Sequence, residues 1–228
     1  MTLFHALVSV GVMLGFAVMR YVSGRLGHPA WANPVFATAL IILSLLVWRG
    51  INVADFQALA SPLGWALGPA IVALAAVTDL VRPLLIGRAR AALLAIIGGS
   101  LFGMGFCWAL AHLVGLDKAL VAAVSVKTVS SPFLIAILGR FEGPVGLAAA
   151  LSVATGVISA MLVPLLLDRL KITDRDARAL ALGVSGHLVA SEYAIRSDPA
   201  RGGLAIIGLV ITGLMAALLL PLLWGWLL

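Results

Sequence analysis

Long apolar segments separated by short polar loops dominate the chain. Mostly apolar residues occupy positions 3–19, 31–48, 61–81, 91–114, 118–138, 144–167, 177–195 and 203–226. A helix needs roughly 20 such residues to cross the hydrocarbon core of a bilayer. The pattern predicts an all-α polytopic membrane protein with seven or eight membrane segments, in a single transmembrane domain over residues 1–228.

The composition agrees with this pattern. The 228 residues are 63% hydrophobic and only 11% charged, whereas about 25% of the residues in a soluble domain are charged. A soluble fold of this length could not bury so much apolar surface. The apolar run at 3–19 has no basic residues before it, so we interpret it as a first span and not as a cleaved signal. We therefore expect a multi-pass protein of the inner (plasma) membrane.

Segment 118–138 contains a lysine followed by hydroxyl residues and a proline. An unpaired lysine at the bilayer centre costs about 2.5–3.5 kcal/mol on insertion scales, so it must face water, a partner or a ligand. The proline removes a backbone donor. Together these features predict an unwound stretch that binds a small carboxylate, with these candidate residues: Lys127, Thr128, Ser130, Ser131 and Pro132. The alternatives are that Lys127 snorkels to an interface or forms a structural ion pair with Asp79 or Glu192.

Segment 177–195 is the second unusual stretch. Ser185 and a glycine precede His187, and Glu192 lies five residues further on. Histidine titrates near neutral pH, which predicts a proton-responsive or substrate-contacting group opposite Lys127. The alternative is a hydrogen bond between helices. A lone histidine without a companion at ligand spacing does not predict a metal site, and we expect no cofactor.

Two further motifs accompany these segments. Gly68 and Pro69 should break the helix at 61–81, and the half-helix that follows would direct its positive end into the protein. Asn33 precedes Pro34 and is expected to cap a helix, although we also retain it as a substrate-binding candidate. Asp79 is a candidate counter-ion for Lys127, or else lies near the membrane edge.

The distribution of basic residues bears on topology. If segment 118–138 re-enters without crossing, one side carries nine basic residues: Arg20, Arg25, Arg82, Arg88, Arg90, Arg169, Lys171, Arg175 and Arg178. The other side then carries five: Arg49, Lys118, Arg140, Arg196 and Arg201. If the segment crosses fully, the bias shrinks to eight against six. The positive-inside rule therefore favours the re-entrant model, with an external N-terminus and a cytoplasmic C-terminus. This arrangement would relate segments 31–114 and 144–226 as an inverted repeat.

Several motifs together resemble the LrgB/CidB family of bacterial membrane proteins, whose domain also occurs in the plastid glycolate/glycerate translocator. The motifs are "NP" at 33–34, "GPAIVALA" at 68–75, "KTVSSP" at 127–132, "GP" at 143–144, "TG" at 155–156 and "ARALALGVSGH" at 177–187. The resemblance implies a fold related to cation/proton antiporters, with broken helices. It also implies transport of small carboxylates such as glycolate, glycerate, pyruvate or acetate.

The preferred hypothesis is a secondary transporter of small organic anions that is proton- or cation-coupled and homo-oligomeric. The alternative that the resemblance implies is a holin/antiholin-like regulator of murein hydrolase activity and lysis, acting with an LrgA/CidA-like membrane partner. A membrane enzyme is disfavoured because no GxSxG elbow is present. No nucleic-acid partner is expected, since the net charge of +6 arises mostly from short loops between apolar segments.

Overall fold

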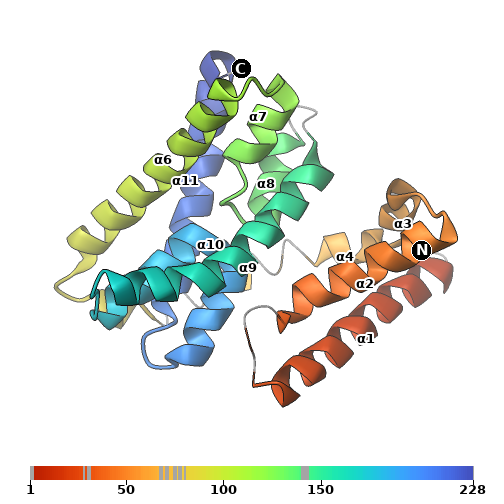
Figure 1. Ribbon diagram of the computed structural model, residues 1–228, viewed down its shortest axis with the longest axis horizontal. Coiled ribbons are helices and arrows are strands. Elements are labelled where there is room, and N and C mark those ends of the chain that lie inside the picture. Colours follow the sequence, from red (N-terminus) through yellow and green to blue (C-terminus); the bar gives the residue numbers. More distant parts are fainter. Residues whose placement is uncertain are drawn as a thin grey trace. The chain divides into compact units, whose positions relative to one another are not determined.

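The computed structural model describes residues 3–27, 29, 32–66, 69, 72–73, 76, 79, 81–139 and 144–227, and over these residues its regular elements are all helices. The chain divides into two compact units, Met1–Ala73 and Leu74–Leu228 (Figure 1). Each unit is described by itself. The single domain expected over residues 1–228 stays a prediction.

The described residues of the first unit form the helices α1 (Leu3–Arg25), α2 (Pro34–Arg49), α3 (Val53–Leu59) and α4 (Ser61–Trp65). Asn33 precedes α2, and its Oδ1 accepts hydrogen bonds from the backbone N–H of Val35 at 2.9 Å and of Phe36 at 3.3 Å. Pro34 occupies the first turn, where its missing N–H costs nothing. The predicted cap is therefore confirmed.

The described residues of the second unit form a short 3-10 helix and six α-helices. These are η2 (Arg82–Leu85), α6 (Ala89–Leu113), α7 (Lys118–Ser125), α8 (Ser131–Leu138), α9 (Val145–Arg169), α10 (Arg175–Ser197) and α11 (Leu204–Leu227). Across the described residues of both units, four helices are long and apolar enough to cross a membrane: Leu3–Arg25, Ala89–Leu113, Val145–Arg169 and Leu204–Leu222. They coincide with four of the predicted segments. The predicted segment 61–81 lies partly outside the described residues.

Helix α10 doubles back on itself. Its backbone is non-helical at Gly186 (φ −131°, ψ 16°) and His187 (φ 41°, ψ −133°). Arg175 at the start of α10 binds Asp198 just after its end, with Nε–Oδ2 and Nη2–Oδ1 distances of 2.7 and 2.5 Å. A straight helix of 23 residues would hold these ends about 33 Å apart. Segment 175–197 is therefore a helical hairpin whose tip is Gly186–His187.

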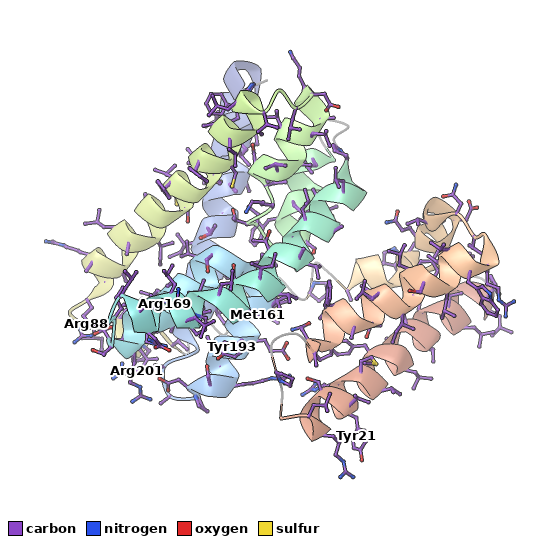
Figure 2. The ribbon with its side chains drawn as sticks, in the orientation of Figure 1. Tyr21, Arg88, Met161, Arg169, Tyr193 and Arg201 are labelled. Atoms are coloured by element: carbon purple, nitrogen blue, oxygen red, sulfur yellow. The ribbon has the colours of Figure 1, made fainter. Side chains whose placement is uncertain are left out.

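Ion pairs gather several helix ends at one end of this unit. Arg88, which caps α6, lies 3.2 Å from both Asp174 and Asp176 at the start of α10. Arg201, just before α11, lies 3.3 Å from Asp176. We call this region the ion-pair end, and Arg88 and Arg201 are labelled there in Figure 2. Helices α6 and α11 run away from the ion-pair end, and α9 runs toward it (Figure 1).

The segment between α6 and α9 forms a second hairpin, which enters from the opposite end. Both α6 and α9 have 25 residues, or about 37 Å each, so residues 114–144 start and finish far from the ion-pair end. Helices α7 and α8 have only eight residues each and are separated by a non-helical stretch at 126–130. The break falls where the sequence predicts it, and the segment turns back at Lys127.

Close backbone packing fixes the α10 hairpin to α11. A Cβ atom added to Gly183 would overlap the carbonyl group of Ala205, and one added to Gly202 would overlap the carbonyl group of Ala194. Hairpin 118–138 is held by apolar packing along its length. Val126, Leu134 and Leu138 are fully buried in one hydrophobic core. The two hairpins are therefore held on opposite ends of one helical scaffold.

Candidate functional site

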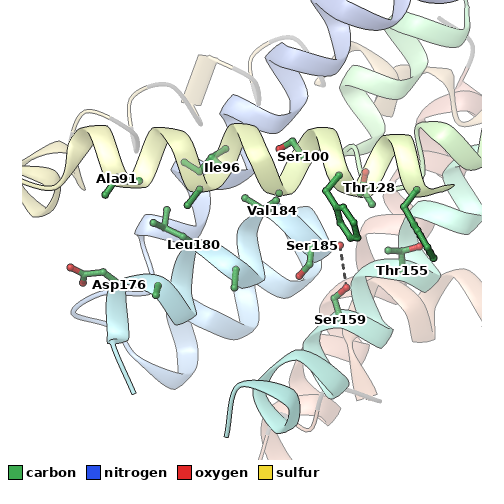
Figure 3. Close-up of a pocket in the computed structure, with 18 of the residues that line it drawn as sticks. Ala91, Ile96, Ser100, Thr128, Thr155, Ser159, Asp176, Leu180, Val184 and Ser185 are labelled. Carbon is green, nitrogen blue, oxygen red and sulfur yellow. Dashed lines mark hydrogen bonds between the residues drawn. The ribbon is translucent and has the colours of Figure 1, made fainter. Parts of the chain in front are cut away.

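A cavity of about 1040 Å³ lies within the second unit, between α6, α9 and the first arm of α10. Arg88, Asp174 and Asp176 line it at the ion-pair end, and Lys127 and Thr128 line it at the other. Figure 3 shows Asp176 and Thr128 at opposite ends of this space. The cavity thus leads from one end of the unit to the hairpin tips.

Most of the cavity wall is apolar. Small and aliphatic residues of α6 and α10 form its long sides: Ala91, Ala92, Ala95, Ile96, Gly99, Leu180, Ala181 and Val184. The polar groups other than those at the ion-pair end are hydroxyls, from Ser100, Thr128, Thr155, Ser159 and Ser185, and the ammonium of Lys127. Such a wall, with a few convergent polar groups, is typical of a small-molecule site.

The tip of the first hairpin holds the predicted lysine. Lys127 and Thr128 are half-buried and line the cavity. Ser130 is 5% exposed, and its hydroxyl is buried without a hydrogen-bond partner among the described residues. Ser131 is half-buried, and Pro132 stands in the first turn of α8.

The tip of the second hairpin holds Ser185 and His187. The Ser185 carbonyl accepts a hydrogen bond from Ser159 Oγ on α9 at 3.1 Å (Figure 3). The Ser185 hydroxyl is buried and, among the described residues, lacks a partner. Buried polar groups are nearly always hydrogen-bonded, so each tip carries one unsatisfied hydroxyl among the described residues, and Ser185 also lines the cavity.

Ser152 of α9 contacts both tips. Its Oγ donates to the carbonyl of Val129 at 2.9 Å and lies 3.1 Å from His187 Nε2, which is also 2.6 Å from the Ser152 carbonyl. The hydroxyl has one proton, which goes to Val129, and a carbonyl can only accept. Both contacts with His187 therefore require the proton on Nε2, which leaves Nδ1 without one in the neutral ring. Lys127 lies near enough for its charge to act on this imidazole.

The sequence analysis did not single out Ser152 or Ser159. Together with Gly156 they recur at i, i+4 and i+7 and so share one face of α9. A Cβ on Gly156 would lie 2.9 Å from His187 Cε1 and 3.0 Å from the Gly186 carbonyl. This spacing of small and hydroxyl residues in an apolar helix was the signal that could have identified them.

The remaining candidates lie elsewhere. Asn33 and Pro69 belong to the first unit, where Asn33 caps α2 and Pro69 is exposed. Gly68 lies outside the described residues. Asp79 is exposed, and Glu192 pairs with Arg196 one turn along the same helix. Lys127, Thr128 and Ser185 therefore share the cavity, whereas Glu192 is engaged by an arginine and not by the lysine.

The carboxylates at the ion-pair end are held in their charged form. The backbone N–H of Ala177 and the charge of Arg88 lower the pKa of Asp174, and Arg175 lowers the pKa of Asp198. A lowered carboxyl pKa stabilises the fold above the unfolded pKa, and this contribution is lost as the pH falls through the folded value. The ion pairs of Asp174 with Arg88 and of Asp198 with Arg175 therefore persist at neutral pH.

These features define a helical membrane protein in which two hairpins bring a cation and hydroxyl groups to one cavity, with a buried histidine at the second tip. A family model described as the LrgB-like family matches residues 12–226. The chain belongs to the LrgB-like family, as the sequence motifs indicated.

Comparison with known proteins gives relatives of moderate identity. An uncharacterized protein of Haemophilus influenzae is 25% identical over 213 residues, covering 92% of this chain and 90% of that protein. The antiholin-like protein LrgB of Bacillus subtilis is 23% identical, covering 83% and 82%. The plastidal glycolate/glycerate translocator 1 of Arabidopsis thaliana is 30% identical over 109 residues, which are 47% of this chain and 21% of that protein. No solved structure matches.

Proposed function

We propose that this protein is a secondary carrier of small organic anions of the glycolate, glycerate, pyruvate or acetate type. The observation that carries the proposal is that Lys127 and Ser185 line one cavity from the two hairpin tips. Among the described residues, the buried hydroxyl of Ser185 has no hydrogen-bond partner, nor has that of Ser130, three residues after Lys127. An ammonium and two hydroxyls are the donors that a carboxylate requires. The name of the plastid relative, a glycolate/glycerate translocator, agrees with this chemistry.

The depth and direction of the hairpins support a site near the middle of the bilayer. His187 lies 12 residues into α10, or about 18 Å from the ion-pair end, and a hydrocarbon core is about 30 Å thick. The helical arms that follow Ser130 and His187 both begin at the tips. Their N-termini carry partial positive charge, which favours an anion between them.

Proton coupling would use the free nitrogen of His187. With Nε2–H donated to Ser152, a proton can be added only at Nδ1. A second positive charge beside Lys127 is unfavourable unless an anion is bound between the two groups. A proton and a carboxylate would therefore bind together at this site.

The hairpins suggest a particular internal repeat. Helix α6 followed by hairpin 118–138 corresponds to α9 followed by hairpin 175–197, and the two pairs enter from opposite ends. We propose this pairing as the inverted repeat, in place of the pairing of 31–114 with 144–226. In this scheme α6, α9 and α11 cross the membrane and the hairpins re-enter it.

Uptake by the purified protein in proteoliposomes tests the carrier function. Radiolabelled glycolate should enter with saturation and should be competed by unlabelled pyruvate or acetate, because a carrier has a limited number of sites. Liposomes without protein are the control.

The name of the antiholin-like relative favours the alternative of a lysis regulator with an LrgA/CidA-like partner. Non-saturable leakage of glycolate together with an uncharged sugar would support that alternative and contradict a carrier.

The re-entrant hairpins change the expected orientation. With both hairpins returning to their own side, the ion-pair end carries nine basic residues: Arg82, Arg88, Arg90, Arg169, Lys171, Arg175, Arg178, Arg196 and Arg201. Between α6 and α9 the basic residues outside the Lys127 tip are Lys118 and Arg140. The positive-inside rule then places the ion-pair end in the cytoplasm. We therefore propose an external C-terminus, opposite to the sequence-based prediction, while the external N-terminus stays a prediction.

Reporter fusions to the full-length protein check this orientation. Alkaline phosphatase at the C-terminus should be active, and green fluorescent protein at the same place should be dark, because that end of α11 lies outside. A reporter inserted at Lys171, in the loop between α9 and α10, is the internal control and should behave in the opposite way. A fluorescent C-terminal fusion would contradict the proposed orientation.

A further inference from the structure

Ser152 is fully buried in α9 and bonds to both hairpin tips, although the tips come from segments 23 and 35 residues away. We propose that Ser152 is a positioning residue that links the two tips, so that the placement of Lys127 depends on that of His187. The link exists without a ligand. Only its effect on uptake rests on the proposed carrier function.

The bond to Val129 holds the first tip. Val129 is 1% exposed and lies two residues after Lys127 and one before Ser130, in the stretch where helical hydrogen bonding is interrupted. A buried carbonyl that loses its donor bears its full desolvation penalty. Removing the Ser152 hydroxyl should therefore loosen the backbone that carries both Lys127 and Ser130.

The contact with His187 holds the second tip. His187 adopts φ 41° and ψ −133°, a conformation that residues other than glycine rarely adopt. Such a backbone persists only where the surroundings hold it. Ser152 supplies two acceptors, Oγ and the carbonyl, and Gly156 one turn later leaves space for the ring.

The geometry of the shared hydroxyl makes the two tips interdependent. Its single proton is fixed on Val129, and this orientation presents the lone pair that faces His187 Nε2. If the Val129 carbonyl moves away, the hydroxyl is free to rotate, and His187 keeps the Ser152 carbonyl but loses the second of its two acceptors. A movement of one tip is therefore transmitted to the other through one side chain.

Hydrogen–deuterium exchange of the purified full-length protein, without added ligand, tests the link. Ser152→Ala removes the hydroxyl but keeps the backbone carbonyl that faces His187. Exchange should rise about fivefold or more at residues 126–130 and also at 185–188, because loss of a buried hydrogen bond lowers the local opening free energy. A role confined to local structure would accelerate exchange at 126–130 only.

The matched control is Ser125→Ala in the same hairpin. Ser125 is also buried, but its hydroxyl bonds to Val121 within its own helix. Exchange at both tips and the thermal midpoint should stay near wild-type values in this variant. If Ser152→Ala does not yield folded protein, Ser152→Cys replaces it, since a thiol is of similar size and a weaker donor.

The outcomes separate this inference from the carrier function. Faster exchange at both tips supports the link, whereas faster exchange at one tip or at neither overturns it. A second arm adds millimolar glycolate to the wild-type protein, where a carrier site predicts slower exchange at both tips. Absence of that protection would count against the proposed function and would leave the result for Ser152 unchanged.

Discussion

Replacing Gly183 with alanine is expected to prevent the α10 hairpin from docking on α11. The added Cβ would overlap the backbone of Ala205, which is itself completely buried. A flexible side chain could rotate away, but a helix backbone cannot. We therefore expect a destabilisation at or above the ~3 kcal/mol upper end of usual overpacking effects.

The measurement is the yield of monodisperse protein in size-exclusion chromatography, together with the thermal midpoint. Gly98→Ala in α6 is the matched control, because a Cβ at that position meets nothing within 4 Å. That substitution should be neutral or stabilising by up to about 1 kcal/mol, since alanine favours a helix more than glycine does. Equal thermal midpoints for the two variants would show that α10 and α11 do not pack as closely as described.

Replacing Lys127 with alanine is expected to abolish saturable glycolate uptake while the protein still folds. The lysine lines the cavity and is half-buried, so a bound carboxylate would lose its charged partner in a poorly solvated place. Removing one partner of such a pair typically costs at least about 2 kcal/mol, which corresponds to a loss of about 30-fold or more in uptake efficiency.

Two further variants make this result specific. Lys118→Ala lies in the same hairpin at an exposed position and should transport like the wild type. Lys127→Arg keeps the charge with a different shape and should retain part of the activity. Undiminished uptake by Lys127→Ala, with a normal elution profile, would remove the lysine from the mechanism.

The site could be anticipated from the sequence only in part. Lys127 and its neighbouring hydroxyls stood out because a cation and helix-weakening residues are costly in an apolar segment. Ser185 and His187 stood out for the same reason. Ser152 did not, because burying a single serine in an apolar helix costs little free energy. Its role comes only from the Val129 carbonyl and the His187 imidazole, which approach it in the folded chain.

The sequence did not decide the topology of the interrupted segments, although the distribution of basic residues favoured a re-entrant segment 118–138. The hydroxyl residues and the proline after Lys127 predicted an unwound stretch there, but such a break is compatible with a kinked crossing and with a hairpin. The choice is made by contacts between distant residues, such as Arg175 with Asp198 and Arg88 with Asp174. These contacts bring helix ends together, and no local pattern records them.

The sequence by itself determined that this is an all-helical membrane protein of the LrgB-like family. The length of an apolar segment and its capping and helix-breaking residues are local properties, so they can be recognised in each segment separately. The tertiary structure alone decided that both interrupted segments turn back, from opposite ends, and that their tips meet at one serine. That decision depends on ion pairs and close glycine packing between segments far apart in the sequence, such as Arg88 and Asp176 at a separation of 88 residues, which only the folded chain brings into contact.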